Sequence, residues 1–287
     1  MVSVLERIDS ALAGRYDYAD LECVRKALCM ELLGMSQLQY YTGETYCPAP
    51  ERERMLDAAL ERLAAGEPLQ HVLGTAQFMG LELKVDGRVL VPRPETAGLV
   101  EWVLSDCGQT GTLLDIGTGS GCIAISLSHL LPSWSVQAWD ISPDALQVAR
   151  ENNLKCGTKV EFRQRDILSA VCSDFRFDVI VSNPPYVTQS EKALMEPVVL
   201  DYEPHLALFV PDDDALRFYR AISDFAMKSL NSGGRLYFEI NPLFAHELKD
   251  MLERKGYRNV TLRSDDFGKL RYIKADTDDR KGRTDKG

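Results

Sequence analysis

The sequence has little of what membrane proteins and metalloproteins need. No apolar stretch approaches the roughly 20 residues of a membrane-spanning helix. Glu6, Arg7 and Asp9 interrupt the amino-terminal segment, which a secretory signal would keep apolar. The four histidines show neither HExxH nor a related spacing. We therefore expect a cytoplasmic protein that makes no membrane contact and holds no metal ion.

The cysteines follow no ordered pattern. There are seven of them, scattered along the chain, and no two form a CxxC pair. Disulfide frameworks and zinc sites rest on regularly spaced sets of cysteines. The pattern therefore predicts reduced thiols in a cytosolic chain.

An excess of basic charge is also missing. The net charge is −10. Residues 1–75 carry 7 Lys and Arg against 12 Asp and Glu, and the remaining residues carry 26 against 31. Proteins that grip DNA or long RNA normally show a basic surface. This charge disfavours stable nucleic-acid binding, although a local basic patch is compatible with an acidic average.

The chain of 287 residues is long enough for one large domain or two smaller ones. Apolar residues recur at helical spacing over 1–75, which predicts a small helical bundle without a catalytic motif. Over 76–92, alternating apolar residues flank Asp86-Gly87, which is typical of a hairpin turn. We interpret this segment as a hairpin that joins two domains.

From residue 111 onward, strand and helix patterns alternate. The expected strands lie at 112–116, 136–139, 160–163, 177–182, 235–240, 258–263 and 270–275. Helices are expected between them, together with a long loop over 187–211 and a connecting loop at 231–234. This order predicts an α/β domain over 93–275 with a Rossmann-like, doubly wound, mostly parallel seven-stranded sheet. The polar segment 276–287 is expected to be a disordered tail.

A glycine-rich loop follows the first expected strand of this domain. Its sequence is Asp115-Ile116-Gly117-Thr118-Gly119-Ser120-Gly121. Glycines allow a tight turn and a close approach of a ligand to the main chain. The helix that follows offers free N–H groups to a carboxylate or phosphate. A plain strand-to-helix turn is the alternative, because the spacing is G-x-G-x-G and not the G-x-G-x-x-G of dinucleotide-binding proteins.

Acidic residues follow the next two expected strands. Asp140 ends the second strand and Asp166 follows the third. An acidic side chain at the position of Asp140 is suited to the two hydroxyls of a ribose. Together with Asp115, these carboxylates are expected in one crevice at the carboxyl edge of the sheet, which makes the plain-turn alternative much weaker.

Asn183-Pro184-Pro185-Tyr186 follows the fourth expected strand. One alternative is a proline-rich turn that merely ends a strand. However, proline has a fixed φ and no N–H, so the carbonyl of Pro184 would be rigid and free. With the side-chain oxygen of Asn183, it would offer two acceptors to a planar –NH₂ group. Tyr186 would add a flat wall and a hydroxyl.

These motifs together resemble the class I methyltransferases that modify planar amino groups with S-adenosylmethionine. Within that class, the chain is similar to the bacterial release factor glutamine methyltransferase (PrmC/HemK) family. The resemblance extends to about residue 275 and is weakest over the first 60 residues. Its further segments are EPLQHVLG at 67–74, VPRPET at 91–96, SNPPYV at 182–187 and YEP at 202–204. RPET, LDIGTGSG and SNPPY in combination are highly specific, whereas NPPY alone is shared with DNA methyltransferases.

The resemblance implies methyl transfer to the side-chain amide of the glutamine in the Gly-Gly-Gln motif of class I release factors. The implied catalytic residues are Asn183, Pro184 and Tyr186. The implied cofactor-binding residues are Asp115, Gly117, Thr118, Gly119, Ser120, Gly121, Asp140, Asp166, Ile167 and Asn183. The implied substrate-binding residues are Asn183, Pro184, Pro185, Tyr186, Arg93 and Glu95. For Arg93 and Glu95, a structural role between hairpin and domain is an equally good interpretation.

Two positions depart from the family. The family often has an aromatic residue where this chain has Ile167, and it usually continues as Glu-x-Gly where this chain has Glu239-Ile240-Asn241. Ile167 can still pack on an adenine, and Asn241 is given no role. The helical bundle would either dock the release factor or serve as a structural cap.

Three rival functions remain at this point. A nucleic-acid amino methyltransferase acting on adenine, cytosine or guanine would share the NPPY chemistry. A nicotinamide-dependent oxidoreductase would share the fold, although the glycine spacing disfavours it. A non-catalytic binding module would share the fold without the chemistry, although NPPY and Asp140 make it a weak alternative.

Overall fold

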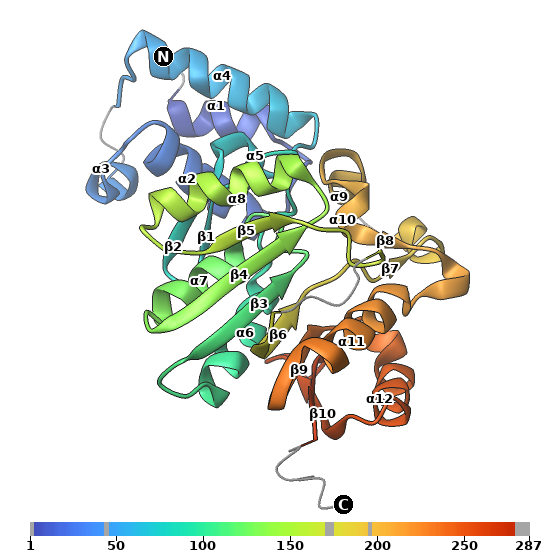
Figure 1. Ribbon diagram of the computed structural model, residues 1–287. Helices are drawn as coiled ribbons and strands as arrows, with labels where there is room; N and C mark the ends of the chain where they lie inside the picture. Colours follow the sequence, from blue (N-terminus) through green and yellow to red (C-terminus); the bar gives the residue numbers. More distant parts are fainter. Residues whose placement is uncertain (1–2, 43–45, 170–174, 195–196, 279–287) are drawn as a thin grey trace, which may run out of the picture. The chain divides into compact units, whose positions relative to one another are not determined.

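The computed structural model describes residues 3–42, 46–169, 175–194 and 197–278. The chain divides into two compact units (Figure 1). The smaller unit takes the chain up to residue 75 together with 196–202. The larger unit takes 76–195 and the chain from 203 onward, so the hairpin segment belongs to it.

The smaller unit is helical. Its elements are α1 (Val4–Ala11), α2 (Tyr18–Ala27), the π-helical turn η1 (Leu28–Leu32), α3 (Gln37–Thr42), α4 (Pro50–Ala64), α5 (Leu69–Leu73) and α9 (Pro197–Tyr202). Local sequence explains several ends: Ser3 and Glu6 form a capping box on α1, and Pro50 occupies the first turn of α4. Ile8, Leu28 and Leu56 are fully buried in its apolar core.

The hairpin turns earlier than the sequence predicted. Its strands are β1 (Thr75–Phe78) and β2 (Leu81–Lys84), so the turn lies at Met79-Gly80 and not at Asp86-Gly87. Met79 and Gly80 both have positive φ (49° and 77°), as a two-residue hairpin turn requires. The sequence pattern was misleading because Val85, Val89 and Val91 are buried against α8 (Pro143–Lys155) without forming a strand.

The larger unit contains the expected seven-stranded sheet, in the order β10-β11-β9-β6-β3-β4-β5. Its strands are β3 (Gly111–Ile116), β4 (Trp134–Asp140), β5 (Glu161–Gln164), β6 (Phe177–Ser182), β9 (Leu230–Glu239), β10 (Arg258–Ser264) and β11 (Leu270–Asp276). The pairs β3–β4, β3–β6, β4–β5 and β6–β9 are parallel, and β11 is antiparallel to both its neighbours. The prediction of a mostly parallel, doubly wound sheet is confirmed.

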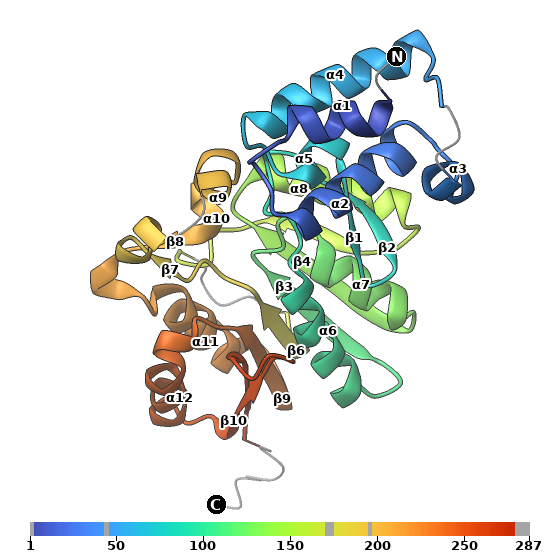
Figure 2. The ribbon, with the colours of Figure 1, turned by 180° about the vertical axis from the view of Figure 1, so that it is seen from behind.

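Helices cover both faces of this sheet. Leu113 packs with residues of α6 (Pro94–Asp106) and α7 (Cys122–Leu130), whereas its neighbour Leu114 packs with α11 (Arg217–Ser229) and α12 (Ala245–Arg254). Figures 1 and 2 both show α11 and α12 together beside β9 and β10. Because successive side chains of a strand point to opposite faces, a strand covered on both sides reads as a continuous apolar run.

Two loop predictions were wrong. Segment 187–211 contains two short paired strands, β7 (Val187–Thr188) and β8 (Phe209–Val210), as well as η2 (Ser190–Leu194), α9 and α10 (His205–Leu208). These elements are too short to show a periodicity. Segment 231–234 belongs to β9, which accommodates its glycines through a register irregularity against β6.

The predictions for the tail, the cysteines and membrane-spanning helices can be compared only with the described residues. Most of the expected tail, 279–287, lies outside them, while Asp276 ends β11. Cys172 also lies outside them, and the six described cysteines are free thiols. Within the described part of the chain, no helix has the length and apolarity that a bilayer crossing requires.

Candidate active site

A pocket lies in the larger unit where β3, β4, β5 and β6 end. In doubly wound parallel sheets, ligands bind at the carboxyl ends of the strands, at the point where the strand order reverses. Eight of the predicted site residues line the pocket: Gly117, Gly119, Asp140, Asp166, Ile167, Asn183, Pro184 and Pro185. The other predicted residues are not part of its lining: Arg93, Glu95, Asp115, Thr118, Ser120, Gly121 and Tyr186.

The glycine loop is fastened to the end of β4. The N–H groups of Gly117 and Thr118 both donate to the carbonyl of Trp139, at 2.8 and 3.0 Å. The N–H of Gly119 donates to Oδ2 of Asp140 at 2.9 Å. Gly117 and Gly119 have positive φ (75° and 55°), and a Cβ on either would meet no atom within 4 Å. Their backbone therefore borders open space, which a ligand can approach closely.

Gly121 has a packing role. It is the N-cap of α7 with φ of 84°, and a Cβ there would come within 2.7 Å of the side chain of Ile125. Asn152, which is fully buried on α8, donates to the carbonyl of Ser120 at 2.9 Å and also pairs with both backbone groups of Lys84. The second half of the loop is therefore held by the protein interior.

Two of the three predicted carboxylates lie deep at this edge. Asp140 accepts from the N–H groups of Gly119 and Ser142, each at 2.9 Å, and burial raises its pKa above the ordinary value. Asp115 is fully buried and accepts from the hydroxyl of Thr118 at 2.6 Å. Burial is also the main reason that the pKa of Asp115 rises to about 7. Asp140 lines the pocket, whereas Asp115 lies outside the lining and holds the glycine loop through its bond with Thr118.

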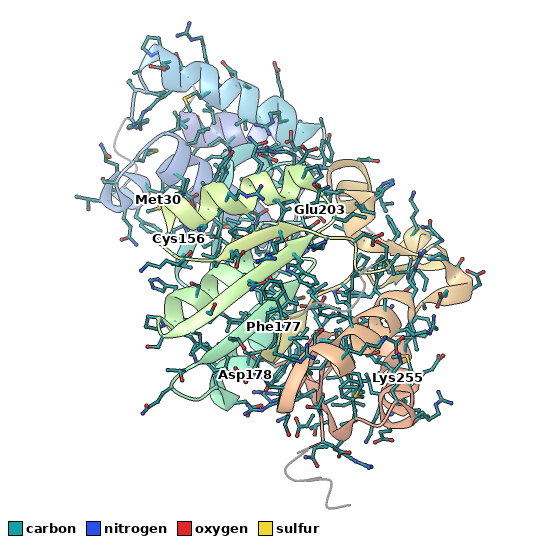
Figure 3. All side chains as sticks on the ribbon, viewed as in Figure 1. Met30, Cys156, Phe177, Asp178, Glu203 and Lys255 are labelled. Atoms are coloured by element: carbon teal, nitrogen blue, oxygen red, sulfur yellow. The ribbon has the colours of Figure 1, made fainter. Side chains whose placement is uncertain are left out.

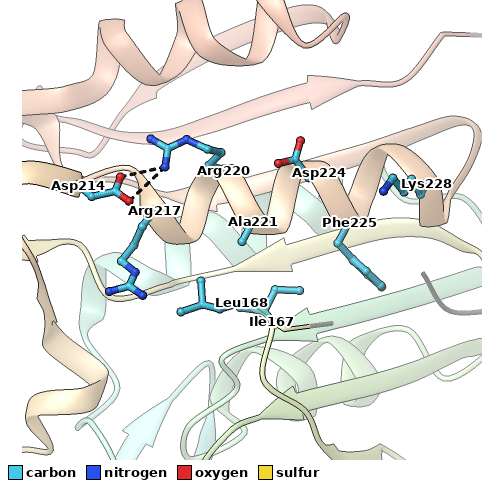
Figure 4. Close-up of a pocket in the computed structure, with 9 residues that line it drawn as sticks. All are labelled: Ile167, Leu168, Asp214, Arg217, Arg220, Ala221, Asp224, Phe225 and Lys228. Carbon is cyan, nitrogen blue, oxygen red and sulfur yellow. Dashed lines mark hydrogen bonds and ion pairs between the residues drawn. The ribbon is translucent and has the colours of Figure 1, made fainter. Parts of the chain in front are cut away.

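Asp166 and Ile167 form one wall of the pocket. Asp166 accepts from the N–H of Leu168 at 2.9 Å, which fixes the turn after β5. Ile167 and Leu168 also line a second cavity, together with residues of α11 that face them (Figure 4). That cavity is lined by charged side chains, among them Arg220, which is paired with Asp214 at 3.0 Å. Ile167 is the one predicted site residue in its lining.

The Asn-Pro-Pro-Tyr segment leaves β6 beside the glycine loop. The hydroxyl of Ser182 donates to the carbonyl of Ile116 at 2.6 Å, so the ends of β6 and β3 are joined. The side-chain nitrogen of Asn183 lies 3.4 Å from the hydroxyl oxygen of Thr96. Asn183 and Pro184, which carry the two predicted acceptors, both line the pocket.

Tyr186 points away from the pocket. Its hydroxyl donates to Oε1 of Glu239 at 3.1 Å, and burial raises its pKa above the ordinary value. Glu239 itself is only 1% exposed at the end of β9, and burial raises its pKa as well. Asn241 donates to the carbonyl of Tyr186 at 3.1 Å and to the carboxylate of Glu191. Asn241, which stands where the family usually has glycine, thus holds the backbone of Tyr186 in place.

Arg93 forms an ion pair with a buried carboxylate. Its guanidinium lies 2.5 Å from Oε2 of Glu203, which is labelled in Figure 3 and also accepts from the N–H of Val91 at 3.2 Å. Glu203 directly precedes Pro204, which lines the pocket together with Leu206 and Ala207. Arg93 and Glu203 both belong to the larger unit, so their ion pair joins two segments within that unit. The backbone carbonyl of Glu95 accepts from the hydroxyl of Tyr272 at 2.6 Å.

Two family models and several known proteins match this chain. The PrmC N-terminal domain model matches residues 3–74, and the methyltransferase small domain model matches residues 95–206. A release factor glutamine methyltransferase of Bacteroides thetaiotaomicron is 44% identical, over 93% of this chain and 97% of that protein. One of Streptococcus pneumoniae is 39% identical, over 79% and 81%. The chain belongs to the release factor glutamine methyltransferase family.

Solved structures share the fold of this family member. A methyltransferase from Pyrococcus furiosus matches with a TM-score of 0.53 and 19% identity, over 80% of this chain and all of that one. The hMettl16 catalytic domain in complex with an RNA hairpin matches with a TM-score of 0.56 and 19% identity, over 76% and 81%. At this identity the likeness confirms the methyltransferase fold alone.

Several functional candidates in this methyltransferase escaped the sequence analysis. Thr96 and Glu203 stood inside the quoted RPET and YEP motifs, but no spacing rule connects them to Asn183 or Arg93. Glu239 was noted for its neighbours and not for its own carboxylate. Arg88, Val89 and Leu90 line the pocket from the segment after the hairpin, and their sequence carried no signal of it. Only the folded chain brings these residues to the same edge.

Proposed function

We propose that this protein transfers a methyl group from S-adenosylmethionine to the side-chain amide nitrogen of the glutamine in the Gly-Gly-Gln motif of class I peptide chain release factors. The observation that carries this proposal is the 44% identity with a release factor glutamine methyltransferase over nearly the whole of both chains. The pocket supports it, because Asn183 and Pro184 lie beside the glycine loop and Asp140.

The pocket residues fit S-adenosylmethionine, the cofactor of this methyltransferase class. The open approach at Gly117 and Gly119 suits the methionine part, and the carboxylate of Asp140 suits the ribose hydroxyls. Ile167 offers an apolar surface to the adenine, with Asp166 beside it. The bound cofactor supplies a methyl group activated by a sulfonium. Asp115, Thr118, Ser120 and Gly121 support the loop from outside the pocket.

The protein's own residues would contribute by orienting the glutamine amide of the substrate. An amide nitrogen is a weak nucleophile, because its lone pair is delocalised. The side-chain oxygen of Asn183 and the carbonyl of Pro184 would each accept one N–H of the glutamine amide and hold its nitrogen in place. Well-oriented reactants gain on the order of 7–11 kcal/mol from such positioning. The acceptors would also stabilise the positive charge that develops on the nitrogen, and the proton then leaves to water.

The same acceptors provide selectivity. A substrate without an –NH₂ group would leave two polar oxygens unpaired in the pocket, which is costly. Pro185 adds an apolar wall to the pocket, and Tyr186 holds the segment in place from its inner side. The placement of Arg93 and Glu95 favours a structural role over direct substrate contact.

The proposed partner is a class I release factor, which places the protein in the bacterial cytoplasm. The smaller helical unit matches the PrmC N-terminal domain model and has an apolar core of its own. We assign it the docking of the release factor, with a structural cap as the alternative role. A free Gly-Gly-Gln peptide should then be a poorer substrate than the intact factor.

The test is peptide mass spectrometry of a release factor incubated with this protein and S-adenosylmethionine. The expected result is one added methyl group on the glutamine of Gly-Gly-Gln. A release factor with that glutamine replaced by alanine is the control and should stay unmodified. Parallel incubations with DNA and RNA test the nucleic-acid alternative. Methylated adenine, cytosine or guanine together with an unmodified release factor would overturn the proposal.

A further inference from the structure

A chain of hydrogen bonds leads from the pocket into the interior of the larger unit. The side-chain nitrogen of Asn183 lies 3.4 Å from the hydroxyl oxygen of Thr96. That hydroxyl donates to Oε2 of Glu239 at 2.7 Å, and the hydroxyl of Tyr186 donates to Oε1 of the same carboxylate at 3.1 Å. Thr96 is 2% exposed and Glu239 is 1% exposed. The chain therefore links both polar residues of the Asn-Pro-Pro-Tyr segment to one buried carboxylate.

The carboxylate sets the direction of every bond in this chain. Glu239 accepts a hydroxyl proton at each of its oxygens, from Thr96 at Oε2 and from Tyr186 at Oε1, as an ionised carboxylate that cannot donate does. Burial raises the pKa of Glu239, whereas these two hydroxyls and the nearby guanidinium of Arg271 favour its ionised form. The single proton of the Thr96 hydroxyl is therefore directed toward Glu239. The hydroxyl oxygen then faces Asn183 as an acceptor. It can be satisfied only by the –NH₂ end of that side-chain amide.

The two ends of an asparagine amide have nearly the same shape but opposite hydrogen-bonding roles. If the Asn183 amide were turned by 180°, its oxygen would meet the oxygen of Thr96 with no proton between them. Its –NH₂ group would then face the pocket, where it would meet the –NH₂ group of the substrate. Only the orientation selected by Thr96 presents an acceptor to the substrate.

We propose that Thr96 and Glu239 are positioning residues that hold the side-chain amide of Asn183 with its oxygen toward the substrate amino group. This inference rests on the proposed function, because it assumes that Asn183 receives an amide N–H. It goes beyond that function because it assigns the orientation of Asn183 to two residues outside the pocket lining. Neither residue touches the reacting atoms.

The first test compares Thr96→Val with Thr96→Ser. Valine keeps the shape of threonine but removes the hydroxyl, whereas serine keeps the hydroxyl. Without its acceptor, the –NH₂ group of Asn183 is left unpaired when the substrate covers it. We expect kcat/KM for the release factor to fall by about 10- to 100-fold in Thr96→Val. We expect Thr96→Ser to stay within about threefold of the wild type, and cofactor affinity to be unchanged in both.

A matched control lies at the opposite edge of the sheet. Thr112 also donates to a carboxylate, Oδ2 of Asp178, at 2.9 Å, but it belongs to the amino end of β3. Thr112→Val removes the same kind of bond and should leave kcat/KM unchanged. If both threonine-to-valine variants lose activity equally, or if Thr96→Ser is as weak as Thr96→Val, the effect is one of general packing and the inference is wrong.

Glu239→Gln provides an independent variant. Glutamine keeps the size of the side chain but adds a donor, so the Thr96 hydroxyl can accept from it and donate to the oxygen of Asn183. We expect a loss in kcat/KM of about 10-fold or more, without a loss of cofactor affinity. Full activity in both Glu239→Gln and Thr96→Val would overturn the inference. If the wild type itself leaves the release factor unmodified, the proposed function fails instead, whatever the variants do.

Discussion

The two units of this protein differ in what they bury. Among the described residues, fifteen polar or charged side chains are buried, and only His71 belongs to the smaller unit. The other fourteen belong to the larger unit. Burying a polar group is costly unless it is hydrogen-bonded. The smaller unit thus has an almost purely apolar core, whereas the larger unit maintains a polar interior.

Several of the buried polar residues of the larger unit lie near the pocket. Thr96, Asp115, Thr118, Ser182 and Glu239 all lie at or next to the carboxyl edge of the sheet, and each makes a hydrogen bond within this edge. Hydrogen bonds between buried polar groups help to fix their relative positions. The comparison therefore indicates that the larger unit uses polar contacts to support the residues around its pocket, whereas the smaller unit is held together by apolar packing.

The largest expected effect concerns Asn183→Ala, which removes a pocket acceptor from the larger unit. We expect kcat to fall by about 100- to 1000-fold, because an acceptor aimed at the developing charge is lost. The dissociation constant for S-adenosylmethionine should change little, and isothermal titration calorimetry measures it. Asn153→Ala, which alters a neighbouring helix and no pocket residue, is the control. A large loss of cofactor affinity in Asn183→Ala would contradict this division of roles.

Leu56→Ala tests the apolar core of the smaller unit. Leu56 is fully buried in α4, so its truncation should lower the free energy of unfolding of the smaller unit by about 3 kcal/mol. Urea titration followed by circular dichroism measures this change. Met55→Ala, at a position that is 46% exposed, should have a much smaller effect. Cofactor affinity should stay constant in both variants, and a decrease would show that the smaller unit takes part in cofactor binding.

Asp140→Ala should weaken cofactor binding by about 10- to 100-fold, because charged hydrogen bonds to the ribose contribute roughly 1.5–3 kcal/mol. Turnover at saturating cofactor should remain, and a steady-state titration separates the two quantities. Asp144→Ala removes an exposed carboxylate from the first turn of α8 and is the matched control. An unchanged dissociation constant in Asp140→Ala would remove this residue from the ribose site.

The smallest effect is a dependence of the larger unit's stability on pH. Burial raises the pKa of Asp115 from 3.8 to about 7, so the folded state retains a proton that the unfolded state has lost. This contribution is fully present below pH 3.8 and is lost as the pH rises through 7. Between pH 6 and pH 8 the loss is about 1.4 kcal/mol. Asp115→Asn should flatten this part of the profile, measured by urea unfolding at several pH values; an equal slope in both proteins would contradict the assignment.

Most of the larger unit could be predicted from the sequence. Buried parallel strands read as apolar runs, and the motifs at their ends fall at one edge because parallel strands all end on the same side. The glycine loop, Asp140, Asp166 and Asn183 were therefore expected together, and the structure brings them together. The hairpin turn and the segment 187–211 were predicted wrongly, because short elements lack a period and a valine-rich segment can be buried without forming a strand.

The sequence by itself determined the fold class, the pocket edge and the family, because these depend on local periodicity and on motifs that lie within a few residues of each other. Only the tertiary structure decided which residues support the pocket. Asn183 meets Thr96, Thr96 meets Glu239, and Arg93 meets Glu203, each across a long separation in the chain. The direction of a hydrogen bond depends on the group behind it, and that group is known only once the chain has folded.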